Sequence, residues 1–186
     1  METALFTTLN ALPAHVPGLG RIAVAIAQDG IVLYAVLLLW LWVRAGPAVE
    51  PRRTLLLAVF AAVLAFGVNA VLNVAYPRPR PFNVLPAHVL VPRPHDTSFP
   101  SDHAAVTTAI GAVLIAGDQA AWGVAALIGA AAIGVARVIV GIHYPSDIAG
   151  GMAVGAGCAA GIYGTRRFLQ PVVDVLIALA RRLRLG

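Results

Sequence analysis

The sequence SFPSDHAAVTTAIGAVLIA, residues 98–116, places a cluster of reactive side chains directly before a long apolar run. Ser101, Asp102 and His103 supply a hydroxyl, a carboxylate and an imidazole within three positions. Charged groups are scarce elsewhere: 60% of the 186 residues are hydrophobic and 11% are charged, whereas ordinary soluble domains carry about 25% charged residues. The composition therefore predicts an all-α membrane protein, with this cluster where an apolar helix meets water.

Five apolar segments predict a polytopic bundle of membrane-spanning helices, in a single domain that covers residues 1–186. The segments lie at about residues 22–43, 54–74, 101–116, 120–142 and 145–163. The third is shorter than the roughly 20 residues that a bilayer requires. In the fifth, the pairs Gly151 and Gly155, and Gly157 and Gly161, have the four-residue spacing of small residues that lets helices pack closely.

Both ends of the chain are expected to lie on the membrane surface. Residues 5–12 are mildly apolar and predict a short interfacial helix. Residues 168–186 combine apolar positions with arginines and predict an amphipathic surface helix, with a sixth membrane crossing as the alternative. The connection at 76–100 is rich in proline, which predicts an ordered but non-helical loop of the kind that often carries function.

Polar side chains interrupt two of the apolar segments. Asp29, beside Gly30, either faces the bundle interior or lies near the interface where water reaches it. Asn69 and Asn73 are four residues apart and share one helical face. They either bond a neighbouring helix or face a polar site.

The arginines divide between the two sides of this five-span arrangement, and all 13 basic residues are arginines. One side collects Arg44, Arg52, Arg53, Arg166, Arg167, Arg181, Arg182 and Arg184. The positive-inside rule makes that side cytoplasmic. The other side collects Arg21, Arg78, Arg80, Arg93 and Arg137, together with Ser101, His103, His143 and Asp147. Three polar groups that are distant in the sequence are therefore predicted to meet on the outer face.

The outer group has the composition of a site for an anion with several oxygens. Arginine binds phosphate through paired hydrogen bonds, and a helix N-terminus offers free backbone amides. Arg78, Arg80 and Arg137, with Ser101 at the start of a helix, provide both. The arginines lie at the ends of apolar segments without interleaved aromatic residues, which excludes nucleic acid as the partner.

Two histidines add a nucleophile and an acid to this group. His143 precedes Asp147 by four residues, so a carboxylate in the first turn of the last span can reach the imidazole and stabilise its protonated form. His103 comes from a different helix and is placed to protonate a leaving oxygen. No close acidic cluster or His-x-x-x-His pair indicates a metal site, so no metal or other cofactor is expected.

In its motifs the chain resembles the type-2 phosphatidic acid phosphatase superfamily of membrane lipid phosphatases. That family carries Lys-x6-Arg-Pro, Pro-Ser-Gly-His and Ser-Arg-x5-His-x3-Asp. The counterparts here, within a motif core at residues 73–147, are Asn73-x6-Arg80-Pro81, Pro100-Ser101-Asp102-His103 and Ala136-Arg137-x5-His143-x3-Asp147. Asn73, Asp102 and Ala136 depart from the family pattern, and Arg78 is a candidate replacement for the missing lysine. The run Arg78-Pro79-Arg80-Pro81-Phe82 further resembles the bacterial undecaprenyl-pyrophosphate phosphatases of the bacitracin-resistance type.

This resemblance implies a metal-independent hydrolysis through a phosphohistidine. His143 would attack the terminal phosphorus, His103 would protonate the leaving lipid phosphate, and Asp147 would orient His143. The phosphate ligands would be Arg80, Ser101 and Arg137, with Asp102, Arg78 and Asn73 beside them. The substrate would be a polyprenyl diphosphate on the outer side of a bacterial plasma membrane, where its hydrolysis would recycle the carrier lipid of cell-wall synthesis.

Three alternatives stay open from the sequence. The same residues suit phosphatidylglycerophosphate or phosphatidate as substrate. A non-catalytic membrane protein that binds or transports lipids would also be apolar, but it gives no reason to pair His143 with Asp147. Vanadate-dependent peroxidases share the motifs, but they are soluble proteins, and the apolar spans argue against that chemistry.

Overall fold

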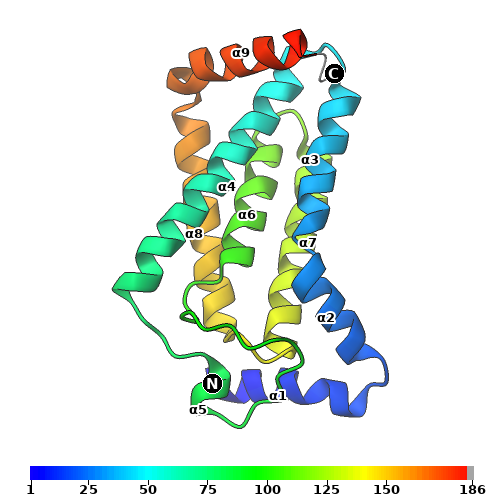
Figure 1. Ribbon diagram of the computed structural model, residues 1–186, viewed down its shortest axis with the longest axis vertical. Helices are drawn as coiled ribbons and strands as arrows, with labels where there is room; N and C mark the ends of the chain where they lie inside the picture. Colours follow the sequence, from blue (N-terminus) through cyan, green and yellow to red (C-terminus); the bar gives the residue numbers. More distant parts are fainter. Residues whose placement is uncertain (184–186) are drawn as a thin grey trace.

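The computed structural model describes residues 1–183, and within them the chain forms nine helices and no strand (Figure 1). The helices are α1 (Glu2–His15), α2 (Leu19–Asp29), α3 (Val32–Ala45), α4 (Val49–Ala75), α5 (Pro81–Val84), α6 (Asp102–Ala116), α7 (Ala120–Ile139), α8 (Pro145–Gly164) and α9 (Arg166–Arg182). The all-helical prediction is thus confirmed. Residues 184–186, including Arg184, lie outside the described part.

Helix α6 lies at the centre of the bundle and packs against α4, α7 and α8. Its contact with α8 is close because two glycines of α8 face its backbone. A side chain at Gly151 or Gly155 would collide with the carbonyl oxygen of Ser101 or Ala105, respectively. The predicted packing role of this first glycine pair is therefore confirmed. A side chain at Gly157 would meet no atom within 4 Å, and the same is true at Gly161, so the second pair has no such role within residues 1–183.

The two terminal helices lie across opposite ends of the bundle (Figure 1). Helix α9 turns by 82° from α8, and Arg53 at the start of α4 pairs with Asp174 of α9 at 2.9 Å. Helix α9 thus lies across the end of the bundle, and its location on the membrane surface stays a prediction. Helix α1 crosses the other end, where Phe6 is fully buried, and it runs through Pro13 beyond the predicted end at residue 12.

The predicted first span, residues 22–43, is two helices in the structure. Helices α2 and α3 meet at a 56° bend after Asp29. A side chain at Gly30 would lie 2.8 Å from Ile133 of α7, so the chain bends where it lies against its neighbour. Asp29 itself is exposed and so does not face the bundle interior, and its place near the membrane interface stays a prediction.

By length and composition, α4 and α7 are each able to cross a membrane, and so are the bent pairs α2–α3 and α8–α9 if each pair counts as one span. Helix α6 has 15 residues and is shorter than the other candidates. These measures give two to four spans among the described residues, and the count of five stays a prediction. Between α4 and α6 the proline-rich connection is non-helical except for α5, as expected.

We expect Gly155→Ala to destabilise the bundle, because the added methyl group would overlap the Ala105 carbonyl oxygen. Overpacking of this kind costs about 1–3 kcal/mol. The measurement is the melting temperature in detergent, with Gly157→Ala as the matched control on the same helix. A melting temperature for Gly155→Ala equal to that of the control would contradict the close α6–α8 contact.

Candidate active site

A cavity of about 240 Å³ lies at the end of the bundle that carries α1 and α5, between α4, α6 and the end of α7. Six of the predicted site residues line it: Asn73, Arg80, Asp102, His103, Arg137 and His143. The three sequence motifs therefore do meet in one place. The rest of the wall combines apolar side chains, including Ile31, Phe66 and Val106, with the polar side chains of Asp96 and Thr97.

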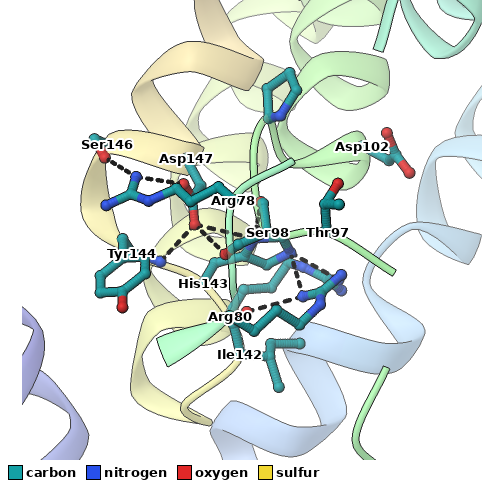
Figure 2. Close-up of polar contacts among 12 residues, drawn as sticks. Arg78, Arg80, Thr97, Ser98, Asp102, Ile142, His143, Tyr144, Ser146 and Asp147 are labelled. Atoms are coloured by element: carbon teal, nitrogen blue, oxygen red, sulfur yellow. Dashed lines mark hydrogen bonds and ion pairs between the residues drawn. The ribbon is translucent and has the colours of Figure 1, made fainter. Parts of the chain in front are cut away.

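His143 lies in the connection between α7 and α8 and is almost fully buried. Its Nδ1 atom is 2.8 Å from the carbonyl oxygen of Ser98 and 3.5 Å from Oδ2 of Asp147 (Figure 2). Both neighbours are acceptors, so the proton of the neutral ring belongs on Nδ1. Nε2 is then unprotonated and accepts hydrogen bonds from the two arginines that it faces.

Two guanidinium groups flank this Nε2 atom. Arg80 Nη1 lies 3.3 Å and Arg137 Nη2 lies 3.2 Å from it. Burial lowers the pKa of His143 to about 4, the charges of Arg137 and Arg80 lower it as well, and Asp147 opposes the shift. The imidazole is therefore a neutral base at pH 7, beside two cations.

Both arginines are held by backbone oxygens, which fixes the direction of their remaining donors. Arg80 donates to the carbonyl of Ile142 at 2.8 Å and to the carbonyl and the carboxylate of Asp96 at 3.1 and 2.7 Å. Arg137 donates to the carbonyl of Ala27 at 3.1 Å. Among residues 1–183, Nε of Arg137 and Oγ of Ser101 are buried without a hydrogen-bond partner. Ser101 is not among the residues that line the cavity. Two cations, one of them with an unpaired buried N–H, suit an anion that has several oxygen atoms.

The start of α6 adds the remaining groups of the cavity. Asp102 and His103 occupy its first turn, so the positive end of the helix dipole is directed at the cavity. Asn69, fully buried on α4, donates to Asp102 at 2.9 Å, whereas Asn73 lines the cavity and accepts from Thr97 at 2.6 Å. Of the two roles expected for these asparagines, Asn69 therefore has the first and Asn73 the second. Asn69 forms a hydrogen bond with a neighbouring helix, and Asn73 faces the polar site.

Asp147 lies behind His143, in the first turn of α8, and is fully buried. Its carboxylate caps that helix by accepting the backbone N–H of Tyr144 at 2.8 Å, and it accepts the Ser98 hydroxyl at 2.5 Å. The predicted pairing with His143 is present, but the nearer acceptor of Nδ1 is the Ser98 carbonyl. Sequence reasoning missed this contact, because a backbone oxygen has no signature in the side-chain pattern.

The interpretation of Arg78 as a phosphate ligand needs correction. Arg78 lies on the far side of Asp147 from the cavity, with Nη1 2.7 Å from Oδ1 of Asp147 and Nη2 2.8 Å from Glu2 (Figure 2). Its guanidinium group also stacks on the Tyr144 ring at 4.0 Å. It therefore does not replace the missing lysine in the cavity. Proximity in sequence to Arg80 gave no sign of this, because the two side chains point to opposite sides of the connection.

The fold and the cavity together define a helical membrane protein with a cavity that two arginines and two histidines line. In sequence, residues 54–170 match the PAP2 superfamily, and the chain belongs to that superfamily. The undecaprenyl-diphosphatase BcrC of Bacillus subtilis is 30% identical over 96% of this chain and 91% of its own length. The putative undecaprenyl-diphosphatase YbjG of Escherichia coli is 30% identical over 85% of this chain and 79% of its own.

A solved membrane-protein structure is also similar. The crystal structure of LpxE from Aquifex aeolicus superimposes with a TM-score of 0.72 at 26% identity, covering 87% of this chain and 93% of that one. The fold, the family and the presence of the motif residues in one cavity thus agree.

We expect the ring of His143 to stay neutral far below pH 6.5. Since its pKa in the folded protein is lowered to about 4, the unfolded chain binds more protons between those two pH values. The stability contributed by the neutral ring is then complete above about pH 6.5 and is lost as the pH falls towards 4. NMR of ¹³C-labelled histidine in detergent, with His143→Gln to assign the signal, measures the titration. A midpoint at or above pH 6.5 would show that the ring is not buried among cations.

Proposed function

We propose that the chain is a lipid phosphatase that hydrolyses undecaprenyl diphosphate to undecaprenyl phosphate and inorganic phosphate. The observation that carries this proposal is the unprotonated Nε2 of His143, which faces the cavity and accepts hydrogen bonds from two arginines at 3.2 and 3.3 Å. A neutral nucleophile between two phosphate-binding cations is the arrangement that phosphoryl transfer requires.

In the first step, Nε2 of His143 attacks the terminal phosphorus and the bond from phosphorus to the bridging oxygen breaks. Arg80, Arg137 and Ser101 hold the non-bridging oxygens. The negative charge of the bound diphosphate offsets the two arginines, so that His103 takes up a proton from solvent on binding and then gives it to the oxygen of the leaving lipid phosphate. The Ser98 carbonyl and Asp147 stabilise the N–H at Nδ1 as the ring becomes a cationic phosphohistidine.

In the second step, water attacks the phosphohistidine. His103, now neutral, takes a proton from that water, the bond from nitrogen to phosphorus breaks, and inorganic phosphate leaves. Both histidines return to their initial state. Asp102 and Asn73 line the same cavity and are assigned to the surroundings of the phosphates.

The lipid character of the substrate is supported by the apolar part of the cavity wall. Ile31 lies at the bend between α2 and α3, Phe66 is on α4, and Val106 is on α6. An isoprenoid chain leaving the polar end of the cavity meets these side chains, whereas its phosphates stay with the arginines. The preference for a diphosphate is supported by the names of the relatives, since Arg78 is not in the cavity to bind a second phosphate.

We propose further that this protein lies in a bacterial plasma membrane with the cavity on the outer side. The cavity is at one end of the bundle, and the arginines of α9 and of the start of α4 are at the other. By the positive-inside rule the arginine-rich end is cytoplasmic. Hydrolysis on the outer side would return the carrier lipid of cell-wall synthesis to its monophosphate form.

The substrate assignment is tested by phosphate release in one detergent, with excess EDTA present, on farnesyl or undecaprenyl diphosphate, phosphatidate and phosphatidylglycerophosphate. We expect the diphosphates to have the highest kcat/KM and His143→Gln to lose several orders of magnitude in rate. Activity should persist in EDTA because arginines supply the positive charge. A higher kcat/KM for phosphatidate or phosphatidylglycerophosphate would change the substrate assignment but not the family. If no lipid released phosphate, the protein would be a non-catalytic lipid-binding or transport protein.

The orientation is tested with single cysteines in a Cys158→Ala background. Asn83→Cys, on exposed α5, should react with a membrane-impermeant thiol reagent in intact cells, whereas Ala48→Cys, at the start of α4, should react only after permeabilisation. The two positions are exposed at opposite ends of the bundle, so each serves as the control for the other. The reverse pattern would place the cavity in the cytoplasm.

A further inference from the structure

The first helix reaches the rear of the candidate active site through one acidic residue. Glu2, at the start of α1, accepts Nη2 of Arg78 at 2.8 Å and the backbone N–H of Ser146 at 3.1 Å, and the Ser146 hydroxyl donates to it as well. These contacts join positions that are 76 and 144 residues apart in the sequence. Helix α1 is therefore attached to the start of α8 by charge as well as by packing.

Arg78 connects Glu2 to Asp147, and Asp147 contacts the proposed nucleophile, His143. Its other terminal nitrogen, Nη1, lies 2.7 Å from Oδ1 of Asp147, and Oδ2 of the same carboxylate lies 3.5 Å from Nδ1 of His143 (Figure 2). The signs alternate along this row: Glu2 is negative, Arg78 positive and Asp147 negative. The nucleophile is the fourth member.

The environment of Arg78 and Glu2 favours both charges. Burial alone would lower the pKa of Arg78, but its contacts with Glu2 and Asp147 raise it. Burial alone would raise the pKa of Glu2, but its hydrogen bonds with Ser146 and Arg78 lower it. Both groups are thus charged at neutral pH.

Other contacts hold α1 against this region independently of Glu2. Phe6 packs on the Tyr144 ring with centroids 5.7 Å apart, and Asn10 donates to the carbonyls of His88 and Ile139 at 2.8 and 2.9 Å. Removal of the charge of Glu2 therefore leaves α1 with its main packing contacts. The charge can be studied apart from the docking of the helix.

We propose that Glu2 and Arg78 are positioning residues for the nucleophile: Arg78 fixes the carboxylate of Asp147 behind His143, and Glu2 holds Arg78 in place. The interfacial helix then belongs to the catalytic apparatus, because its first residue sets the orientation and the electrostatic balance of the histidine. The effects expected on kcat and KM rest on the proposed function, whereas the effect on the protonation of His143 does not.

The two residues have opposite effects on the protonation of His143. Arg78 weakens the pull of Asp147 on the imidazolium, so Arg78→Gln should raise the pKa of His143 and Glu2→Gln should lower it further. The other charged or titratable groups around His143 stay unchanged in both variants. They are Asp147 on α8, Arg137 on α7, Asp102 and His103 on α6, Arg80 before α5, and Asp96, which pairs with Arg80.

The experiment uses the full chain with its affinity tag at the C-terminus, because Glu2 is the second residue. Glu2→Gln, Arg78→Gln, Arg78→Lys and the double Gln variant are compared with Thr7→Ala, an exposed position on α1 whose hydroxyl bonds only within the helix. The measurements are kcat, KM, melting temperature and the NMR titration of His143.

We expect Arg78→Gln to lower kcat by roughly 10–100-fold, the usual effect of losing a group that orients a catalytic one, with little change in KM. Glu2→Gln should lower kcat less, Arg78→Lys should restore part of it, and the double variant should equal Arg78→Gln because Glu2 acts through Arg78. Thr7→Ala should behave as the parent protein.

Two failures are distinguishable. No phosphate release by the parent protein would overturn the proposed function, whereas the NMR titration would still report on the positioning of His143. Parental kcat in Glu2→Gln, or an unchanged His143 titration in Arg78→Gln, would overturn the positioning role. A loss confined to melting temperature would overturn it too, since it would make the row of charges structural only.

Discussion

The buried carboxylate of Asp147 is the interaction on which the rest of this site depends. It is fully enclosed and accepts hydrogen bonds from Tyr144, Ser98 and Arg78. An unpaired carboxylate at this depth would cost several kcal/mol, so these donors are a condition for the fold. The same contacts join the start of α8 to the proline-rich connection, and they fix the Ser98 peptide, whose carbonyl accepts the hydrogen bond from Nδ1–H of His143. The contacts that cap α8 and those that orient the His143 ring are therefore one network, which explains how a loop of irregular backbone holds a histidine in a defined orientation.

The sequence predicted the parts of this site that follow from chain geometry. Asp147 is four residues from His143, and this spacing placed the pair correctly. The positions of Arg80, His103 and Arg137 at the ends of apolar segments predicted that they would meet. The sequence could not predict the contacts that depend on tertiary packing. Neither the Ser98 carbonyl nor the approach of Glu2 from 144 residues away leaves a local pattern, and the bend after Asp29 depends on the contact between Gly30 and α7.

Small residues at the contact between α6 and α8 bring the two helices close together beside the cavity. Gly151 lies against the carbonyl of Ser101, and the backbone N–H of Ser101 donates to the carbonyl of Asp147 at 3.1 Å. This close approach of α6 and α8 brings His103 and His143, from two different elements, to the same cavity. A larger residue at Gly151 would separate the two helices at the point where their ends supply the reactive groups. The glycines of α8 thus contribute to the site indirectly, because they allow the short distance between α6 and α8.

Asn73 stands where the related signature has a lysine, and the charge of the cavity is consistent with that change. Arg80 and Arg137 already lie within 3.3 Å of Nε2 of His143, and a guanidinium group stays protonated in almost any protein environment. The two arginines therefore supply lasting positive charge for a phosphate, and burial keeps His143 neutral beside them. A third cation would make protonation of His143 still harder, but it would also add to the repulsion among buried positive charges. With a neutral amide at position 73, the cavity keeps two guanidinium groups and an unprotonated Nε2, and both properties suit the proposed attack on phosphorus.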